Sequence, residues 1–280
     1  MMATAFSSRR WQLLQLVFLL LSVTTIPIHG YLSSRSITTT AFRQLNRRSP
    51  RLSMSSEPAS KYKKVFVAGG SRGVGHAIVE KLSESGILVV ALVRSEDSKI
   101  ELDKIPGVSA VLGDAFDKEA IEEAMDGCDA AITTLGGTTD DRRVDYVGNN
   151  NVIESAGILG VQRIILVTSI GCGSSRAAAP PNVFEVLKDV LEAKEKAENI
   201  LMDSYTDSNW SIIRPGGLVS EAMTGNAILT EDTTVIGSIH REDVADLVIK
   251  VLHSTKTERK VLSAVDSVAV EGKVIPAFEL

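Results

Sequence analysis

Short apolar runs alternate with amphipathic segments along most of the chain. The apolar runs are β-branched and almost continuously apolar, which is typical of strands buried on both faces of a parallel sheet. Such strands are predicted at residues 64–68, 88–93, 110–112, 130–135, 163–168, 210–214 and 261–264. Helices are predicted between them at residues 74–83, 118–125, 144–156, 183–202 and 241–252. This alternation predicts an α/β fold of the Rossmann type, with a doubly wound parallel sheet.

The first predicted strand leads directly into a glycine-rich turn. Gly69, Gly73 and Gly75 are spaced GxxxGxG, and the amphipathic segment 76–83 follows at once. A strand, a tight turn and a helix start present backbone N–H groups and the positive helix end to a pyrophosphate. We expect Gly69 to permit the turn, Gly73 to let the backbone approach the phosphates and Gly75 to let the helix pack closely. The predicted cofactor contacts in this turn are Gly69, Ser71, Arg72, Gly73, Val74 and Gly75.

The residue that follows the second strand selects between the two nicotinamide dinucleotides. An acidic residue there accepts a hydrogen bond from the ribose 2′-hydroxyl and favours NAD. This chain has Arg94 instead, and Arg72 in the glycine loop is a second cation directed to the same corner. Two guanidinium groups favour a 2′-phosphate, so the predicted cofactor is NADP(H). The alternative is that Arg94 is a solvated residue at a strand end.

The next two strand ends add further candidate cofactor contacts. Asp114 and Ala115 follow the third strand, where a carboxylate can hydrogen-bond the adenine, although Asp114 could equally cap its own turn. Leu135 and Gly136 end the fourth strand, where a small residue leaves room for the middle of the cofactor.

Charge is distributed unevenly between the first 56 residues and the rest. The chain has 30 basic and 35 acidic residues, and seven arginines but no acid lie in residues 1–56, which leaves the rest at about −12. An acidic body argues against nucleic-acid binding, which needs a basic face. We therefore interpret residues 1–56 as a targeting sequence and residues 57–280 as one dinucleotide-binding domain. Its segment 218–236 is too short for a separate substrate domain, so the substrate region is minimal and the pocket small or open.

The predicted targeting sequence has two parts. In residues 1–30, two arginines precede an apolar run of signal-peptide length that is too short to span a bilayer comfortably. Residues 31–56 are rich in Ser, Thr and Arg, a transit-peptide composition. This order resembles the bipartite presequence of algae with secondary plastids, so we expect a plastid protein with no stable membrane span after processing. The alternative is the secretory pathway. The chain has only two cysteines, Cys128 and Cys172, which are too few for a disulfide framework, and this argues against secretion.

Several short sequence blocks, each modest alone, occur in one specific order. Besides the glycine loop they are residues 92–94, 113–114, 144–151, 166–171, 192–198, 212–218 and 240–245. Over about residues 62–278 the chain resembles the short-chain dehydrogenase/reductase superfamily. Within it, the chain is most similar to the atypical, NmrA-like branch that includes plant plastid NAD(P)-binding proteins and biliverdin/flavin reductases.

The resemblance implies roles at the nicotinamide end. The serine beside the nicotinamide matches Ser169, and the lysine of Tyr-x-x-x-Lys, which holds the ribose, matches Lys194. The tyrosine position is occupied by Val190, so the usual acid of carbonyl reduction is absent. The turn along the nicotinamide matches Pro215 and Gly216.

This missing acid separates two classes of substrate. A ketone needs a positioned proton donor, whereas a flavin or quinone spreads the incoming charge and can be protonated by solvent. We expect an NADPH-dependent oxidoreductase for a flavin- or quinone-like acceptor, with Ser169 and Lys194 as its catalytic residues. The alternative is a non-catalytic NADP(H) sensor or plastid assembly protein with a protein partner. No metal is expected, because the four histidines share no ligand spacing with the cysteines, and the start of the last helix, 240–243, is read as structural.

Overall fold

An eight-stranded sheet forms the centre of the protein. The computed structural model describes residues 61–137, 141–205, 207–270 and 275–280, so the predicted targeting sequence lies outside the described residues. The strand order is β3-β2-β1-β4-β5-β6-β10-β8, and all pairs are parallel except β10 with β8. The strands are β1 (Lys64–Ala68), β2 (Leu88–Val93), β3 (Val108–Leu112), β4 (Ala130–Thr133), β5 (Arg163–Val167), β6 (Asn209–Pro215), β8 (Ala227–Thr230) and β10 (Lys260–Asp266).

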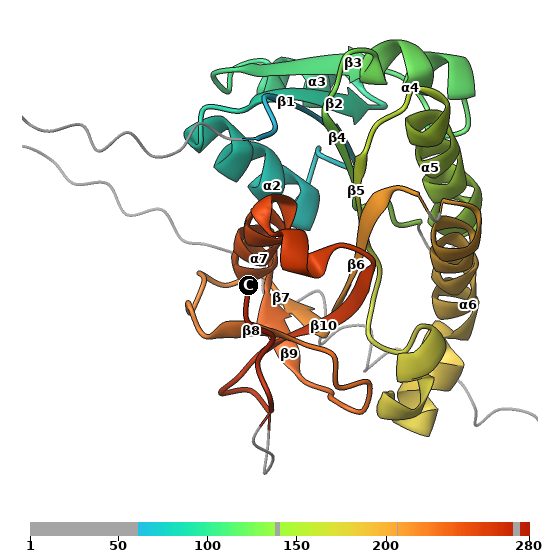
Figure 1. Cartoon of the computed structure of the whole chain (residues 1–280), viewed down its shortest axis with the longest axis vertical. Helices are drawn as coiled ribbons and strands as arrows, with labels where there is room; N and C mark the ends of the chain where they lie inside the picture. Colours follow the sequence, from blue (N-terminus) through green and yellow to red (C-terminus); the bar gives the residue numbers. More distant parts are fainter. Residues whose placement is uncertain (1–60, 138–140, 206, 271–274) are drawn as a thin grey trace, which may run out of the picture. The chain divides into compact units, whose positions relative to one another are not determined.

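Helices cover both faces of this sheet. They are α2 (Gly73–Glu84), α3 (Glu96–Leu102), α4 (Lys118–Met125), α5 (Asn149–Ile158), α6 (Pro181–Ser204) and α7 (Arg241–His253). Figure 1 shows α2 and α7 on one side of the sheet, and α4, α5 and α6 on the other. Side chains of β1 alternate between two cores, because Val65 and Val67 pack with α2 and α7 while Phe66 and Ala68 pack with α4 to α6. The predicted doubly wound, single-domain α/β fold is therefore confirmed.

The strand order reverses at β1. This strand pairs with β2 on one side and with β4 on the other, and its last residue, Ala68, lies opposite Leu92 and Thr133. Loops that leave the carboxyl ends of β1 and β4 therefore diverge and leave a crevice between them. In open α/β sheets this crevice is where ligands bind.

Several short elements were not predicted from the sequence. The predicted helix 144–156 begins instead with a π-helical turn, η1 (Val144–Gly148), that runs into α5. The segment between β6 and α7 forms β7 (Gly217–Val219) and β9 (Ser238–His240), a separate parallel pair, as well as β8. The remaining additions are α3 and the 3-10 turns η2 (Gly173–Ala178) and η3 (Thr255–Thr257). No helix in the described ranges is long and apolar enough to cross a bilayer.

Candidate functional site

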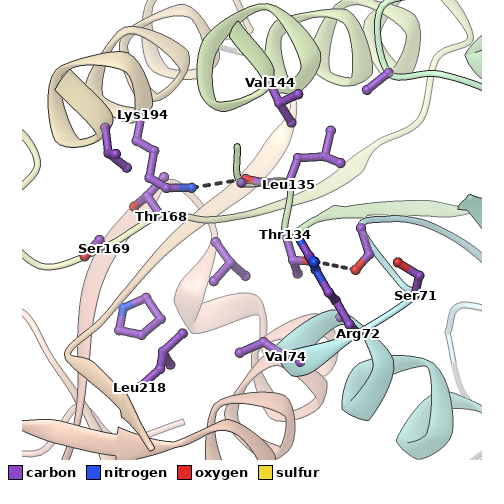
Figure 2. A pocket seen from close by; sticks show the side chains of 18 of the residues that line it. Ser71, Arg72, Val74, Thr134, Leu135, Val144, Thr168, Ser169, Lys194 and Leu218 are labelled. Atoms are coloured by element: carbon purple, nitrogen blue, oxygen red, sulfur yellow. Dashed lines mark hydrogen bonds between the residues drawn. The ribbon is translucent and has the colours of Figure 1, made fainter. Parts of the chain in front are cut away.

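A cavity of about 660 Å³ follows the carboxyl ends of the parallel strands. Figure 2 shows Ser71 and Arg72 toward one end and Lys194 and Ser169 toward the other. Of the residues predicted from the sequence, those that line it are Gly69, Ser71, Arg72, Gly73, Val74, Gly75, Arg94, Asp114, Ala115, Leu135, Gly136, Ser169, Lys194 and Pro215. Gly216 is not part of the wall, because it packs against Gly237: a Cβ at Gly216 would lie 2.2 Å from the Gly237 carbonyl oxygen. The structure thus gathers the predicted residues around one cavity, while their contacts with a ligand stay predictions.

The glycine loop has the conformation that a diphosphate site requires. Gly69 and Gly73 have φ of +86° and +58°, the left-handed region that favours glycine. At Gly75 a Cβ would lie 2.1 Å from the Gly69 carbonyl oxygen, so only glycine lets α2 start this close to β1. The N-terminus of α2 has no side-chain cap and no acidic residue in its first turn. Its free N–H groups and positive dipole end therefore face the cavity without a negative partner from their own helix.

Two arginines and one carboxylate line the end of the cavity formed by β2, and the Asp141 carboxylate also interacts electrostatically with Arg94. Arg72 and Arg94 are exposed and line the wall, and neither makes a salt bridge with a carboxylate in the described ranges. Asp114 also lines this end, and its Oδ1 accepts a hydrogen bond from the Phe116 N–H at 2.9 Å. Asp114 therefore closes its own turn and still faces the cavity. Both interpretations, a contact with the adenine and a cap of the turn, stay open.

Lys194 on α6 is held from two sides. Its Nζ donates to the Leu135 carbonyl oxygen at 3.0 Å and lies 3.1 Å from Oδ1 of Asp145. Asp145 is only 1% exposed, and its Oδ2 accepts from the Gly137 N–H at 3.0 Å. It belongs to the π-helical turn η1, a distortion that is frequent at functional sites. Sequence reasoning missed Asp145, because no local pattern shows that a carboxylate at residue 145 meets a lysine on α6.

A buried ion pair fixes the end of β5, where Ser169 lies. Arg214 on β6 donates to both carboxylate oxygens of Glu198, from Nε at 3.0 Å and from Nη2 at 2.6 Å. The Thr168 hydroxyl donates to Oε1 of Glu198 at 2.6 Å, so β5, α6 and β6 are joined at one point. The Ser169 hydroxyl donates to the carbonyl of Ile170 at 3.0 Å. The proton of Ser169 is therefore engaged within its own loop.

Apart from Thr168 and Ser169, the wall near Lys194 is mostly apolar. Leu187, Val190 and Leu191 contribute from α6, and Leu218 contributes from β7. Leu187 and Leu218 are 40% and 44% exposed, so they form an apolar rim at the opening. Within the described residues, neither a tyrosine nor a histidine lines the cavity. Proton donors on this wall are limited to hydroxyl groups and the lysine ammonium.

Neither cysteine is a reactive thiol of this site. Cys172 and Cys128 are buried and do not line the cavity. Burial raises the pKa of Cys172 to about 12 and that of Cys128 to about 11. Both thiols stay neutral at physiological pH, and a neutral thiol is a poor nucleophile.

The sequence predicts only a structural role for the start of α7, which contains Arg241 and Asp243. Arg241 lines the cavity beside the glycine loop, which the sequence did not indicate. Asp243 lies with His240 and Asp266 in a group whose potential ligand atoms are within 4.8 Å of one another. Oδ1 of Asp243 accepts from the Gly225 N–H at 3.0 Å, and its Oδ2 accepts from the Thr224 N–H at 2.9 Å. Asp243 therefore holds the segment before β8 in place, and we assign it a structural role.

Comparison with known proteins identifies relatives of this chain. Residues 69–255 match the protein family described as NAD(P)H-binding. A chloroplastic protein of Arabidopsis thaliana is 33% identical over 222 residues, covering 75% of this chain and 79% of that protein. Sanguinarine reductase of Eschscholzia californica is 28% identical over 250 residues, covering 72% and 88%. The solved structure of ChuY, an anaerobillin reductase from Escherichia coli O157:H7, is 29% identical with a TM-score of 0.68, covering 76% of this chain and all of that chain.

Proposed function

The chain belongs to the NAD(P)H-binding family, in an atypical branch of the short-chain dehydrogenase/reductases, and from this membership we propose that it is an NADPH-dependent reductase of a flavin- or quinone-like acceptor. Reductases among its relatives support this class of reaction. Sanguinarine reductase and ChuY are both named for reductions, and the chain covers most of each of them.

The residues along the cavity fit a phosphorylated dinucleotide. The uncapped start of α2 and the glycine loop suit a diphosphate. Arg72 and Arg94, which make no salt bridge in the described chain, suit a 2′-phosphate and favour NADP(H) over NAD(H). Lys194, fixed by Leu135 and Asp145, would hold the nicotinamide ribose, as the family resemblance implies. A bound reduced nicotinamide supplies the hydride.

The residues at the acceptor end of the cavity are the main support for a conjugated acceptor. Val190, which the resemblance matches to the tyrosine that protonates a carbonyl, lies on the wall, and the Ser169 hydroxyl is directed to a backbone carbonyl. An unactivated serine is a weak acid, so the chain offers little help to a developing alkoxide. A flavin or quinone needs less help, and Leu187 and Leu218 offer its flat ring system an apolar rim.

We also propose that the protein acts in a plastid. The acid-free, Arg-, Ser- and Thr-rich composition of residues 31–56 supports this location, and so does the chloroplastic relative from Arabidopsis thaliana.

Turnover with a panel of acceptors tests the proposal. The purified protein is given NADPH or NADH with free FMN, a water-soluble naphthoquinone, an aliphatic aldehyde or an aliphatic ketone, and nucleotide oxidation is followed by absorbance. We expect oxidation with the flavin or quinone, faster with NADPH, and negligible turnover of the simple carbonyls. Ordinary enzymatic rates with the ketone would contradict the role given to the missing acid. Tight NADPH binding with no reduction of any acceptor would favour the sensing or assembly alternative.

A further inference from the structure

We propose that Arg241 binds the diphosphate of the dinucleotide and closes the glycine loop from the side of α7. The inference rests on the proposed function, since it assumes a dinucleotide in this cavity. It adds a cation that the glycine motif does not contain and that lies far from the loop in the sequence.

Arg241 lies directly against the turn where a diphosphate would sit. It is the first residue of α7, which packs beside α2 on the same face of the sheet (Figure 1). A Cβ built on Gly73 would lie 3.6 Å from Nε and 3.7 Å from Cδ of Arg241. The arginine lines the main cavity and also a smaller one of about 230 Å³ that shares Gly73 and Ser220 with it. Its guanidinium is therefore near the N–H groups of α2 and accessible to a ligand.

Arg241 makes no salt bridge in the described parts of the chain, although Glu80, Glu221 and Glu242 line the smaller cavity together with it. The Arg241 Nη1 donates a hydrogen bond to the Ser220 hydroxyl oxygen, which leaves most of the five N–H donors of the guanidinium for other acceptors. The neighbouring carboxylate of Asp243 is occupied by Thr224 and Gly225. A guanidinium without a salt bridge beside an uncapped helix start is a strong combination for a dianion, because both favour negative charge at one place.

The hydrogen bond to Ser220 also links Arg241 to the segment that follows β7. Ser220 follows β7, the strand that carries Leu218 at the apolar rim. The first turn of α7 thus holds this segment twice, at Ser220 through Arg241 and at Thr224 through Asp243. A diphosphate bound to Arg241 would be linked through one side chain to the wall that an acceptor contacts.

Probes with and without a diphosphate separate this role from that of the other arginines. We would measure binding of NADPH, NADH and adenosine 2′-monophosphate to the full chain, with the last ligand measured by competition against NADPH. For Arg241→Gln we expect both dinucleotides to bind about tenfold more weakly and by the same factor, since each loses one charge-assisted contact. Affinity for adenosine 2′-monophosphate should be unchanged, because that ligand has no diphosphate.

Control variants show whether the effect is local. Lys250→Gln removes the same charge from the same helix, and Lys250 pairs with Asp246 away from the cavity, so it should bind all three ligands as the unmodified protein does. Thermal unfolding checks that each variant is folded. If Arg241→Gln does not fold, Arg241→Lys replaces it; a lysine lacks the planar fork, so both dinucleotides should still bind a few times more weakly and equally.

Three results would overturn the inference. Unchanged binding of both dinucleotides in the folded Arg241 variant would leave the proposed function intact and reduce Arg241 to a support for Ser220. Equal weakening of adenosine 2′-monophosphate and NADPH would place Arg241 at the 2′-phosphate instead. Failure of the unmodified protein to bind either dinucleotide would remove the proposed function together with this inference.

Discussion

Arg94 occupies the position from which an acidic side chain would recognise the ribose of NAD(H), and it makes no salt bridge in the described chain. Arg94→Asp should erase or reverse a preference for NADPH, because a favourable contact with the 2′-phosphate becomes a repulsion. The expected change in binding free energy is about 1–3 kcal/mol. Fluorescence titration with both cofactors measures it. Lys104→Asp, an exposed charge change outside the cavity, is the control. Equal affinity of the unmodified protein for NADPH and NADH would contradict this prediction.

Lys194 and Asp145 form a nearly buried pair, and its contribution to stability can be separated from its contribution to NADPH oxidation. Lys194→Met leaves Asp145 without a cation, so the free energy of unfolding should fall by about 3–5 kcal/mol. Adding Asp145→Asn removes the unpaired charge and should recover much of that stability. NADPH oxidation should stay low in both variants, because the contact with the ribose is lost in each. Urea unfolding and turnover are measured side by side, and recovered turnover in the double variant would show that Lys194 is only structural.

Residues of the site differ in how far the sequence reveals them. The glycine loop and Arg94 could be predicted because their chemistry depends on spacing from a strand that is itself recognisable. Asp145, Arg241 and the Glu198–Arg214 pair could not, since each acts through a partner brought near only by the tertiary fold. For Gly216 the sequence indicated too much. Its position in the family predicts a contact with the cofactor, but in the structure it packs against Gly237.

The unit formed by β1, the glycine turn and α2 depends on close contact of its backbone segments. At Gly75 a Cβ would lie 2.1 Å from the Gly69 carbonyl oxygen and 2.6 Å from Oγ1 of Thr134, and the backbone cannot yield there. Gly75→Ala should therefore cost about 3 kcal/mol or more in the free energy of unfolding and weaken binding of NADPH. At Gly217 the nearest atom is 3.8 Å away, so Gly217→Ala is the matched control with little loss of stability. Urea unfolding of both variants decides, and similar losses would show that close packing at Gly75 is unimportant.

Elements with a strong apolar pattern were predicted well, and short or distorted ones were not. The bounds of β1, β2 and α4 agree with the prediction, and Asp117 caps α4 by accepting from the Ala120 N–H. In α3 only Leu102 is buried, so this helix has no apolar periodicity to detect. The π-helical turn η1 was missed because its sequence also suits an α-helix, and the choice between them depends on tertiary contacts such as that of Asp145 with Lys194.

At the scale of the whole molecule, two apolar cores enclose the sheet and the cavity opens where the strand order reverses. The sequence predicted this architecture because strands buried on both faces leave long apolar runs, and such runs require helices on both sides. It also predicted that little chain remains for a substrate region, and β7, β8 and β9 together with their loops are all that separates β6 from α7.

The first 56 residues should be dispensable for folding, because the described domain contains its own cores and residues 1–56 have the composition of a targeting sequence. A chain that starts at Glu57 keeps Tyr62, which is 5% exposed in one core, and the hydrogen bonds from the Lys63 and Lys64 N–H groups to Asp129. We expect it to be soluble and to unfold cooperatively.

Binding and a second truncation make this prediction stringent. NADPH at 100 times its dissociation constant should stabilise the chain that starts at Glu57 by about 2.7 kcal/mol, which corresponds to a rise in melting temperature of about 5–11 °C. A chain that starts at Val65 loses Tyr62 and both hydrogen bonds to Asp129, so it should melt at a lower temperature. Calorimetry of the two chains, with and without NADPH, provides the comparison. If the chain from Glu57 is insoluble while the full chain is soluble, then residues before Glu57 belong to the folded domain and the boundary is wrong.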